Sequence, residues 1–289
     1  MQTIKKFGFI FIGLTALIGL VMFFDMVFSG RIILSQTFQL GPLSTHYYGI
    51  TMALAVGSGF YLAIKRAAKY GVSIERAENL LFYLIIFGFI GARLYHVASS
   101  FQYYVQHPLD IIKVWQGGLS IYGALFGGFL CFLILQKIFN LQSSIFNLLD
   151  WLAPSVILGQ IIGRFGNFFN YEAFGYPTNL PWKMFVPAAF RPEQYLNFQY
   201  FHPAFLYEAI GNTIILFFLL KYGEKGKAGS LFFSYLLLYN ILRFFIELIR
   251  TDSVFIGIYR QNAAVSLALV IVSVFALYSL RSSKNAKIS

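Results

Sequence analysis

The sequence is poor in charge, and this scarcity excludes most soluble folds. Only 11% of its 289 residues are charged, 58% are hydrophobic, and the apolar residues fall in runs approaching twenty. Soluble domains carry about 25% charged residues, whereas roughly twenty apolar residues in a row can span a bilayer. We therefore expect an all-α polytopic membrane protein.

Cysteine, histidine and clustered carboxylates are also scarce. The single cysteine, Cys131, lies in an apolar run, cannot form an internal disulfide, and is interpreted as a packing residue. The histidines lack the spacing of metal ligands, and the aspartates are too scattered for a two-metal site. These residues are His46, His96, His107 and His202, and Asp25, Asp110, Asp150 and Asp252. We expect no metal.

Nucleotide motifs and soluble segments are missing as well. The chain has no P-loop, no dinucleotide fingerprint and no soluble domain, so we expect neither a cofactor nor nucleotide-driven work. Acidic residues number 11 against 22 basic ones, which gives a net charge of +11. Because no soluble basic domain could hold nucleic acid, we expect the excess to set topology and to contact membrane lipids rather than nucleic acid.

Eight apolar runs predict about eight transmembrane helices. They cover about 7–28, 48–64, 80–98, 119–135, 148–162, 205–220, 231–249 and 263–280. The first run follows two lysines and ends near small residues, as a signal peptide does, but its apolar part exceeds the usual signal core. We favour a retained extra N-terminal span in residues 1–30, ahead of a transmembrane domain in residues 31–289.

The basic residues predict that both termini are cytoplasmic. Thirteen of the 22 fall in candidate cytoplasmic segments. They are Lys5, Lys6, Lys65, Arg66, Lys69, Arg76, Lys137, Lys221, Lys225, Lys227, Arg281, Lys284 and Lys287. Of the other nine, seven are arginines, which make fixed bidentate contacts to phosphate. The outer half is therefore expected to bind an anionic group, although arginine also snorkels readily.

One stretch, residues 163–175, concentrates polar groups at membrane depth. It reads Gly-Arg-Phe-Gly-Asn-Phe-Phe-Asn-Tyr-Glu-Ala-Phe-Gly and follows the apolar run 148–162. An arginine at the centre of a membrane helix costs roughly 2.5–3.5 kcal/mol, so function is one explanation for keeping it. The glycines permit close approach to a ligand or positive φ, and the asparagines offer paired donors and acceptors. The alternative is a re-entrant turn or helix end whose polar groups satisfy one another.

The longest non-spanning piece, about 163–202, is rich in aromatic residues and prolines. It predicts a small external cap at the membrane interface, too short to be a separate domain. Next to it, Pro203 suits the first turn of a helix, where the dipole favours Glu208. His202 is either a base or a hydrogen-bonding residue.

The seventh span carries a polar stripe. Tyr239, Arg243, Glu247 and Arg250 stand at i, i+4, i+8 and i+11 and share an arc of roughly 80°. Arg243 and Glu247 have ion-pair spacing, which leaves Arg250 free for a ligand. The alternative is a purely structural ion pair.

Polar or tyrosine residues also stand at three other span boundaries. Tyr48 begins the second span, Arg93 lies in the third after a glycine, and Tyr122 enters the fourth. Tyrosines at such positions are also common interfacial anchors.

Residues 163–175 resemble the signature of the prolipoprotein diacylglyceryl transferases, Gly-Arg-x-Gly-Asn-Phe-x-Asn-x-Glu-x-x-Gly, with every fixed position present. The resemblance runs from Leu40 onward and includes the boundary residues and the polar stripe. Residues 1–30 lie outside it, because the family begins with an external segment and about seven spans. Two positions depart from the family: Tyr122 stands where many members have a histidine proposed as the base, and Phe205 replaces a frequent glutamine.

The resemblance implies transfer of the diacylglyceryl group of phosphatidylglycerol to the lipobox cysteine of a preprolipoprotein signal peptide, in the bacterial inner membrane toward the outer leaflet. Such chemistry needs a thiolate and stabilisation of a departing phosphate. The implied roles are phosphate binding by Arg164 and Arg243, with Arg93 and Arg250 in support; headgroup positioning by Asn167, Asn170 and Glu172; orientation of Arg243 by Glu247; and deprotonation assisted by Tyr48, Tyr122, Tyr239 or His202.

Two other functions remain open. A transporter or flippase could use the same arginines to move an intact lipid or organic anion, although paired broken helices in duplicated halves are not evident. Another headgroup enzyme would accept a small nucleophile instead of a thiol.

Overall fold

The described part of the chain is mainly helical. The computed structural model describes residues 13, 15, 18–41, 43–114, 117–138, 144–222 and 226–285. Six helices in it are long and apolar enough to cross a membrane, and two shorter apolar helices cover Ile18–Phe28 and Ile121–Lys137. Seven of the predicted apolar runs coincide with one of these helices, and the described end of the first run, Ile18–Phe28, is also helical, so the prediction of an all-α polytopic membrane protein is confirmed.

Some predictions fall outside the described residues. These are the cytoplasmic placement of Lys5, Lys6, Lys225 and Lys287 and most of the first apolar run before Ile18.

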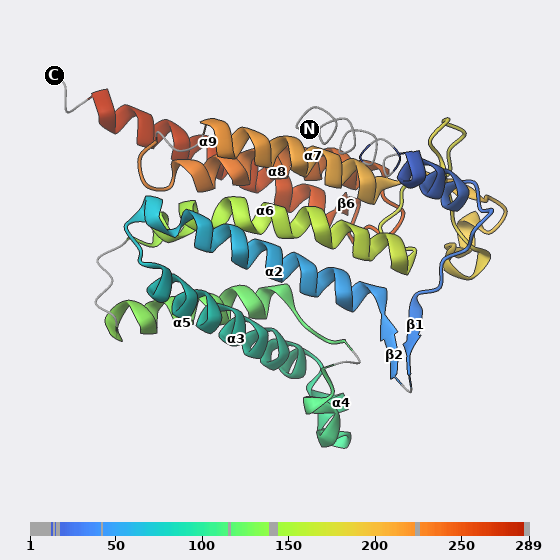
Figure 1. Cartoon of the computed structure of the whole chain (residues 1–289), viewed down its shortest axis with the longest axis horizontal. Helices are drawn as coiled ribbons and strands as arrows, with labels where there is room; N and C mark the ends of the chain where they lie inside the picture. Colours follow the sequence, from blue (N-terminus) through green and yellow to red (C-terminus); the bar gives the residue numbers. More distant parts are fainter. Residues whose placement is uncertain are drawn as a thin grey trace, which may run out of the picture. The chain divides into compact units, whose positions relative to one another are not determined.

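The helices follow one another along the chain (Figure 1). They are α2 (Tyr47–Ala67), α3 (Ile74–Ser99), α4 (Phe101–Gln106), α5 (Ile121–Ile138), α6 (Ile145–Asn170), α7 (Ala204–Tyr222), α8 (Ser230–Ile249) and α9 (Gln261–Asn285). Short 3₁₀ turns cover Ala68–Tyr70, Pro108–Ile112, Ala188–Phe190 and Glu193–Tyr195.

In the described part of the chain, three small antiparallel hairpins lie in the connections. They pair β1 (Thr37–Leu40) with β2 (Leu43–His46), β3 (Met184–Phe185) with β4 (Tyr200–Phe201), and β5 (Phe255–Ile256) with β6 (Tyr259–Arg260). The sequence prediction did not include them, because strands of two to four residues are too short to show an alternating pattern.

The chain forms two compact units. The first contains Met1–Gly59 and Ala153–Ser289, and the second contains Phe60–Leu152. In the first unit α7, α8 and α9 run side by side (Figure 1), and Ile157 of α6 packs with Leu219 and Leu231 in a buried cluster. A second cluster of this unit joins the end of α6 to the segment that follows it.

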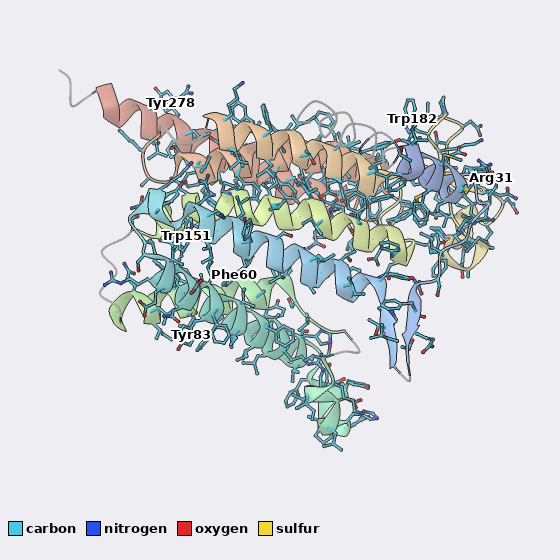
Figure 2. The ribbon with its side chains drawn as sticks, viewed as in Figure 1. Arg31, Phe60, Tyr83, Trp151, Trp182 and Tyr278 are labelled. Atoms are coloured by element: carbon cyan, nitrogen blue, oxygen red, sulfur yellow. The ribbon has the colours of Figure 1, made fainter. Side chains whose placement is uncertain are left out.

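The second unit is centred on α3 and α5, which pack closely. Its core contains Trp151, whose indole N–H donates to the Ala63 carbonyl at 2.8 Å, and Phe60 packs against the same cluster (Figure 2). Cys131 is also buried in this core, which confirms its interpretation as a packing residue.

The helix that carries the signature is longer than predicted. We expected it to end near Ile162, but α6 continues through Asn170, so the segment predicted to form the cap begins at Tyr171 rather than Gly163. A helix continues as long as its backbone hydrogen bonds do, and polar side chains alone do not end it. With 26 residues the helix is about 39 Å long, compared with roughly 30 Å for the hydrocarbon core, so its polar last turns need not lie among lipid tails.

Gly127 tests the close packing of α3 against α5. A Cβ there would lie 3.1 Å from the Gly91 Cα and nearer still to the Phe87 carbonyl, whereas a Cβ on Gly128 would meet nothing within 4 Å. We predict that Gly127→Val lowers the midpoint of thermal unfolding in detergent, since overpacking typically costs about 1–3 kcal/mol. The matched variant Gly128→Val should unfold at the wild-type temperature. Equal shifts in the two variants would contradict this packing.

Candidate active site

Polar side chains from two helices of the first unit, α6 and α8, converge on Glu208 of α7. This residue lies in the second turn of α7, and its side chain is 1% exposed. Arg164 of α6 places Nη2 2.6 Å from Oε1, and Arg243 of α8 places Nη1 3.3 Å from Oε2. Tyr239, also on α8, donates its hydroxyl to Oε1 at 3.3 Å. One buried carboxylate therefore connects α6, α7 and α8.

A second buried carboxylate, Glu247, supports the same arginine. Its Oε2 accepts from Arg243 Nη2 at 2.6 Å, which confirms the ion pair predicted from the i, i+4 spacing. Asn262 of α9 donates to the other oxygen at 3.3 Å. Arg243 is thus held from both sides, by Glu208 and by Glu247.

The charges of this cluster balance. Two guanidiniums face two carboxylates, as expected where an unpaired buried charge would be costly. The side chains of Arg164 and Arg243 are 19% and 13% exposed, while both carboxylates are almost fully buried. An incoming anion can therefore reach the arginines, but it must compete with Glu208 for their donors.

The signature continues this network to the surface. Arg164 donates to Asn167 Oδ1 at 3.2 Å, and Asn167 donates to Glu172 Oε1 at 2.8 Å. Glu172 is exposed, and its backbone N–H donates to the Asn167 carbonyl at 3.0 Å. The backbone carbonyl of Asn170 accepts from Gln36, while its side-chain amide has no hydrogen-bond partner among the described residues. That amide is available to a ligand.

The signature glycines provide space rather than positive φ. A Cβ on Gly166 would lie 2.9 Å from the Tyr48 ring, and one on Gly175 would lie 2.8 Å from the Ile249 carbonyl. The positive φ angles belong instead to Tyr171 (53°) and Ala173 (57°). Left-handed backbone costs a residue with a side chain roughly 1–2 kcal/mol, so surrounding contacts must hold this turn. The residue types in this turn do not predict its positive φ angles.

Tyr48 reaches the signature helix through this close approach. It lies in the first turn of α2, and its ring packs where Gly166 leaves room. The structure thus brings Tyr48 to α6, next to the helical turn that carries Arg164 and Asn167.

His202 is a hydrogen-bonded residue immediately before α7. Its Nδ1 lies 3.1 Å from the Tyr207 hydroxyl, which accepts from the Trp182 indole at 2.7 Å. Its carbonyl accepts from the Gly175 N–H at 2.8 Å, so it adjoins the last residue of the signature. Burial lowers the pKa of the His202 imidazole, which favours the neutral form.

Arg250 differs from the prediction. It caps the C-terminus of α8 and donates to Asp252 at 2.7 and 2.5 Å, so the expectation that it stays free for a ligand is wrong. Because the helix ends at Ile249, the following residues turn and bring Asp252 beside it. Burial opposes charge at both groups, but their mutual hydrogen bonds and attraction raise the pKa of Arg250 and lower that of Asp252.

Arg93 and Tyr122 belong to the second unit. The buried Arg93 guanidinium donates to the backbone carbonyls of Asp110, Ile111, Gly117 and Gly118 at 2.5–3.0 Å, and so holds this segment against α3. Tyr122, in the first turn of α5, is 60% exposed, with its ring centroid 6.2 Å from that of Tyr95. Arg93 thus has a structural role in its own unit, and the substrate roles of both residues stay predictions.

Sequence reasoning noticed Glu208 but gave it no role in the site. Its partners Arg164 and Arg243 stand 44 and 35 residues away, respectively, so no spacing rule links them. The available signal was a carboxylate inside an apolar helix, which needs a buried partner. Within the described ranges, no three His, Cys, Asp or Glu side chains are grouped so that they could hold a metal ion.

Neutralising Glu208 tests the charge balance. Glu208→Gln leaves two largely buried guanidiniums against one carboxylate, and removing one partner from a buried pair typically costs about 3–5 kcal/mol. We predict a clearly lower midpoint of thermal unfolding in detergent. The control Glu193→Gln removes an exposed carboxylate of the cap and should leave the midpoint unchanged. Equal midpoints for both variants would contradict a stabilising role for this carboxylate.

Comparisons with known proteins agree with this arrangement. A family model described as prolipoprotein diacylglyceryl transferase matches residues 35–279. The phosphatidylglycerol–prolipoprotein diacylglyceryl transferase of Thermotoga maritima is 38% identical over 271 residues, 93% of this chain and 92% of the relative. That of Synechocystis sp. is 43% identical over 81% of this chain and 85% of the relative, and that of Staphylococcus aureus is 40% identical over 86% and 89%. The chain therefore belongs to the prolipoprotein diacylglyceryl transferase family.

Proposed function

We propose that this protein transfers the diacylglyceryl group of phosphatidylglycerol to the lipobox cysteine thiol of a preprolipoprotein. The C–O bond between the diacylglyceryl group and the phosphate breaks, and a C–S thioether bond forms. Glycerol 1-phosphate leaves, and the thiol proton passes to a base. The reaction needs no cofactor.

The observation that carries the proposal is the pair of arginines on Glu208, in a chain of this family. A departing phosphate monoester gains negative charge as the C–O bond breaks, and positioned guanidiniums stabilise such charge. Arg164 and Arg243 are both partly exposed and fixed by buried carboxylates, which is the preorganised geometry that this role requires. They bind the phosphate.

Binding of the phosphate weakens the contacts of Glu208. The resting cluster is neutral, so a lipid phosphate adds one negative charge next to two carboxylates. Arg164 is the more exposed arginine and turns its donors from Glu208 to the phosphate, whereas Arg243 stays fixed by Glu247. Glu247 orients Arg243, as its 2.6 Å contact supports.

The exposed end of the network positions the glycerol headgroup. Asn167 and Glu172 are bonded to each other, and the Asn170 amide is available. Amide and carboxylate groups match the hydroxyls of a glycerol headgroup, which both donate and accept. Arg250, paired with Asp252, supports this end through its contact with Gly175 rather than by binding phosphate.

The base is one of four residues. A thiol has an ordinary pKa near 8.5, and a positioned base contributes about 10²- to 10⁴-fold. Tyr239 is bonded to Glu208, Tyr48 packs against the signature helix, and His202 adjoins the end of the signature. Tyr122 stands where the family resemblance implies a base.

The proposed location is the bacterial inner membrane, with both termini cytoplasmic and the site toward the outer leaflet. The excess of basic residues in the predicted cytoplasmic segments supports this orientation. Phosphatidylglycerol and lipobox signal peptides are the substrates. A lipid transporter is the rival, and it would move its substrate intact.

A mass-spectrometric assay tests the reaction. The purified protein in phosphatidylglycerol micelles is mixed with a lipobox peptide, and in parallel with the same peptide carrying serine for cysteine. We predict a diacylglyceryl mass gain on the cysteine peptide alone, because only the thiol becomes a strong nucleophile near neutral pH. No gain with folded, lipid-bound protein would contradict the transferase and favour the transporter.

The role of Tyr122 is tested by two substitutions. If its hydroxyl assists deprotonation, Tyr122→Phe slows the reaction by about 10²-fold or more, while Tyr122→His retains a proton acceptor and much of the activity. The rate is measured with saturating lipid and peptide. Equal rates for the two variants would remove Tyr122 from the mechanism.

A further inference from the structure

The helix Ile18–Phe28 precedes the residues that match the family model, yet it packs into the core of the first unit. Val27 is 2% exposed and lies in a cluster with Phe168, Phe201 and Phe205. The rings of Phe24 and Phe28 have centroids 5.8 and 6.1 Å from that of Phe168, which lies inside the signature. Phe205, the second departure from the family pattern, stacks on Phe168 at 5.2 Å and completes this apolar contact.

The turn after this helix fits the external cap. Gly30 has a φ of +77°, and a Cβ there would lie 2.7 Å from the Phe185 ring of β3. The Tyr200 hydroxyl of β4 donates to the Ser29 carbonyl at 3.3 Å. Both strands of the β3–β4 hairpin therefore contact the residues that follow the helix.

The next residues bind the strained turn of the signature. The Leu34 N–H donates to the Tyr171 hydroxyl at 2.7 Å, and that hydroxyl donates back to the Leu34 carbonyl at 3.1 Å. Gln36 donates to the Asn170 carbonyl at 3.1 Å. These three bonds hold the backbone where Tyr171 and Ala173 adopt positive φ.

This turn also positions the residues of the candidate active site. Glu172 lies between the two residues with positive φ, and it bonds Asn167 through both its backbone and its side chain. Asn167 accepts from Arg164, which binds Glu208. Hydrogen bonds from Leu34 to Tyr171, the peptide link from Tyr171 to Glu172, and the bonds of Asn167 thus connect the N-terminal segment to the arginine proposed to bind phosphate.

We propose that residues 18–36 are a retained brace of the mature protein that positions Glu172, Asn167 and Arg164 for the lipid headgroup. The inference rests on the proposed function for its catalytic consequence, but not for the retention of the segment. Its action is positional, because its hydrogen bonds to the signature reach Tyr171 and Asn170 rather than the two arginines. A cleaved signal peptide would take Val27, Phe24 and Phe28 away from Phe168 and remove the Ser29 carbonyl from Tyr200.

Retention is tested by intact mass. The full chain is produced with a C-terminal tag, purified from membranes and weighed. We expect a mass that includes the helix Ile18–Phe28. A mature protein that begins near Gly30 would overturn the proposal, whatever its activity.

Positioning is tested with Tyr171→Phe and Gln36→Leu, each of which removes bonds between the brace and the signature. Tyr195→Phe is the matched control, because it removes a cap hydroxyl that has no hydrogen-bond partner among the described residues. Hydrogen exchange of the backbone amides at 171–175 is measured by mass spectrometry. We expect about tenfold faster exchange in both test variants, the effect of losing one or two hydrogen bonds, and no change in the control.

The kinetic readout separates positioning from general stability. Misplaced headgroup ligands should raise the KM for phosphatidylglycerol about tenfold and leave the KM for the peptide unchanged. A role in folding alone would lower kcat through loss of active protein and leave both KM values unchanged, and that result would overturn the proposal. If the wild type shows no transferase activity, the proposed function fails, but the hydrogen-exchange rates still test whether the brace holds the turn. Unchanged exchange in both test variants would overturn the proposed brace.

Discussion

The active-site cluster depends on a carboxylate buried between two arginines. Glu208 connects three helices by accepting from Arg164, Arg243 and Tyr239, and Glu247 fixes the second arginine from its far side. In a bilayer, any one of these charges alone would be costly, so their positions depend on one another. The same dependence leaves the arginines in fixed positions and partly exposed, as the proposed exchange of a carboxylate for a phosphate requires.

Two features outside the cluster hold its side chains in position. Close packing at Gly166 brings the Tyr48 ring to the signature helix, and the turn at Tyr171 returns Glu172 to Asn167. Neither the Tyr48 ring nor the backbone of the turn bears charge, yet each limits where Arg164 can lie.

The sequence predicted the features that depend on local spacing. Apolar runs identified the helices, because length and hydropathy suffice for a membrane span. The Arg243–Glu247 pair followed from i, i+4 spacing on one helix. The sequence could not predict that Glu208 pairs with arginines 44 and 35 residues away, because those contacts arise from tertiary packing. Nor could it predict that Asp252 turns back onto Arg250, because that contact depends on where the helix ends. The end of α6 and the positive φ of Tyr171 were also missed, since neighbouring contacts rather than residue type determine them.

The proposed transferase depends on Arg164 and Arg243 binding the phosphate in exchange for Glu208. The most direct measurement is the affinity of the purified protein for glycerol 1-phosphate, by isothermal titration in detergent. We expect weaker binding for Arg164→Ala by about 10-fold or more, as for loss of a charge-assisted contact, and no change for Arg76→Ala, since Arg76 is an exposed arginine of α3. Wild-type affinity in Arg164→Ala would contradict it.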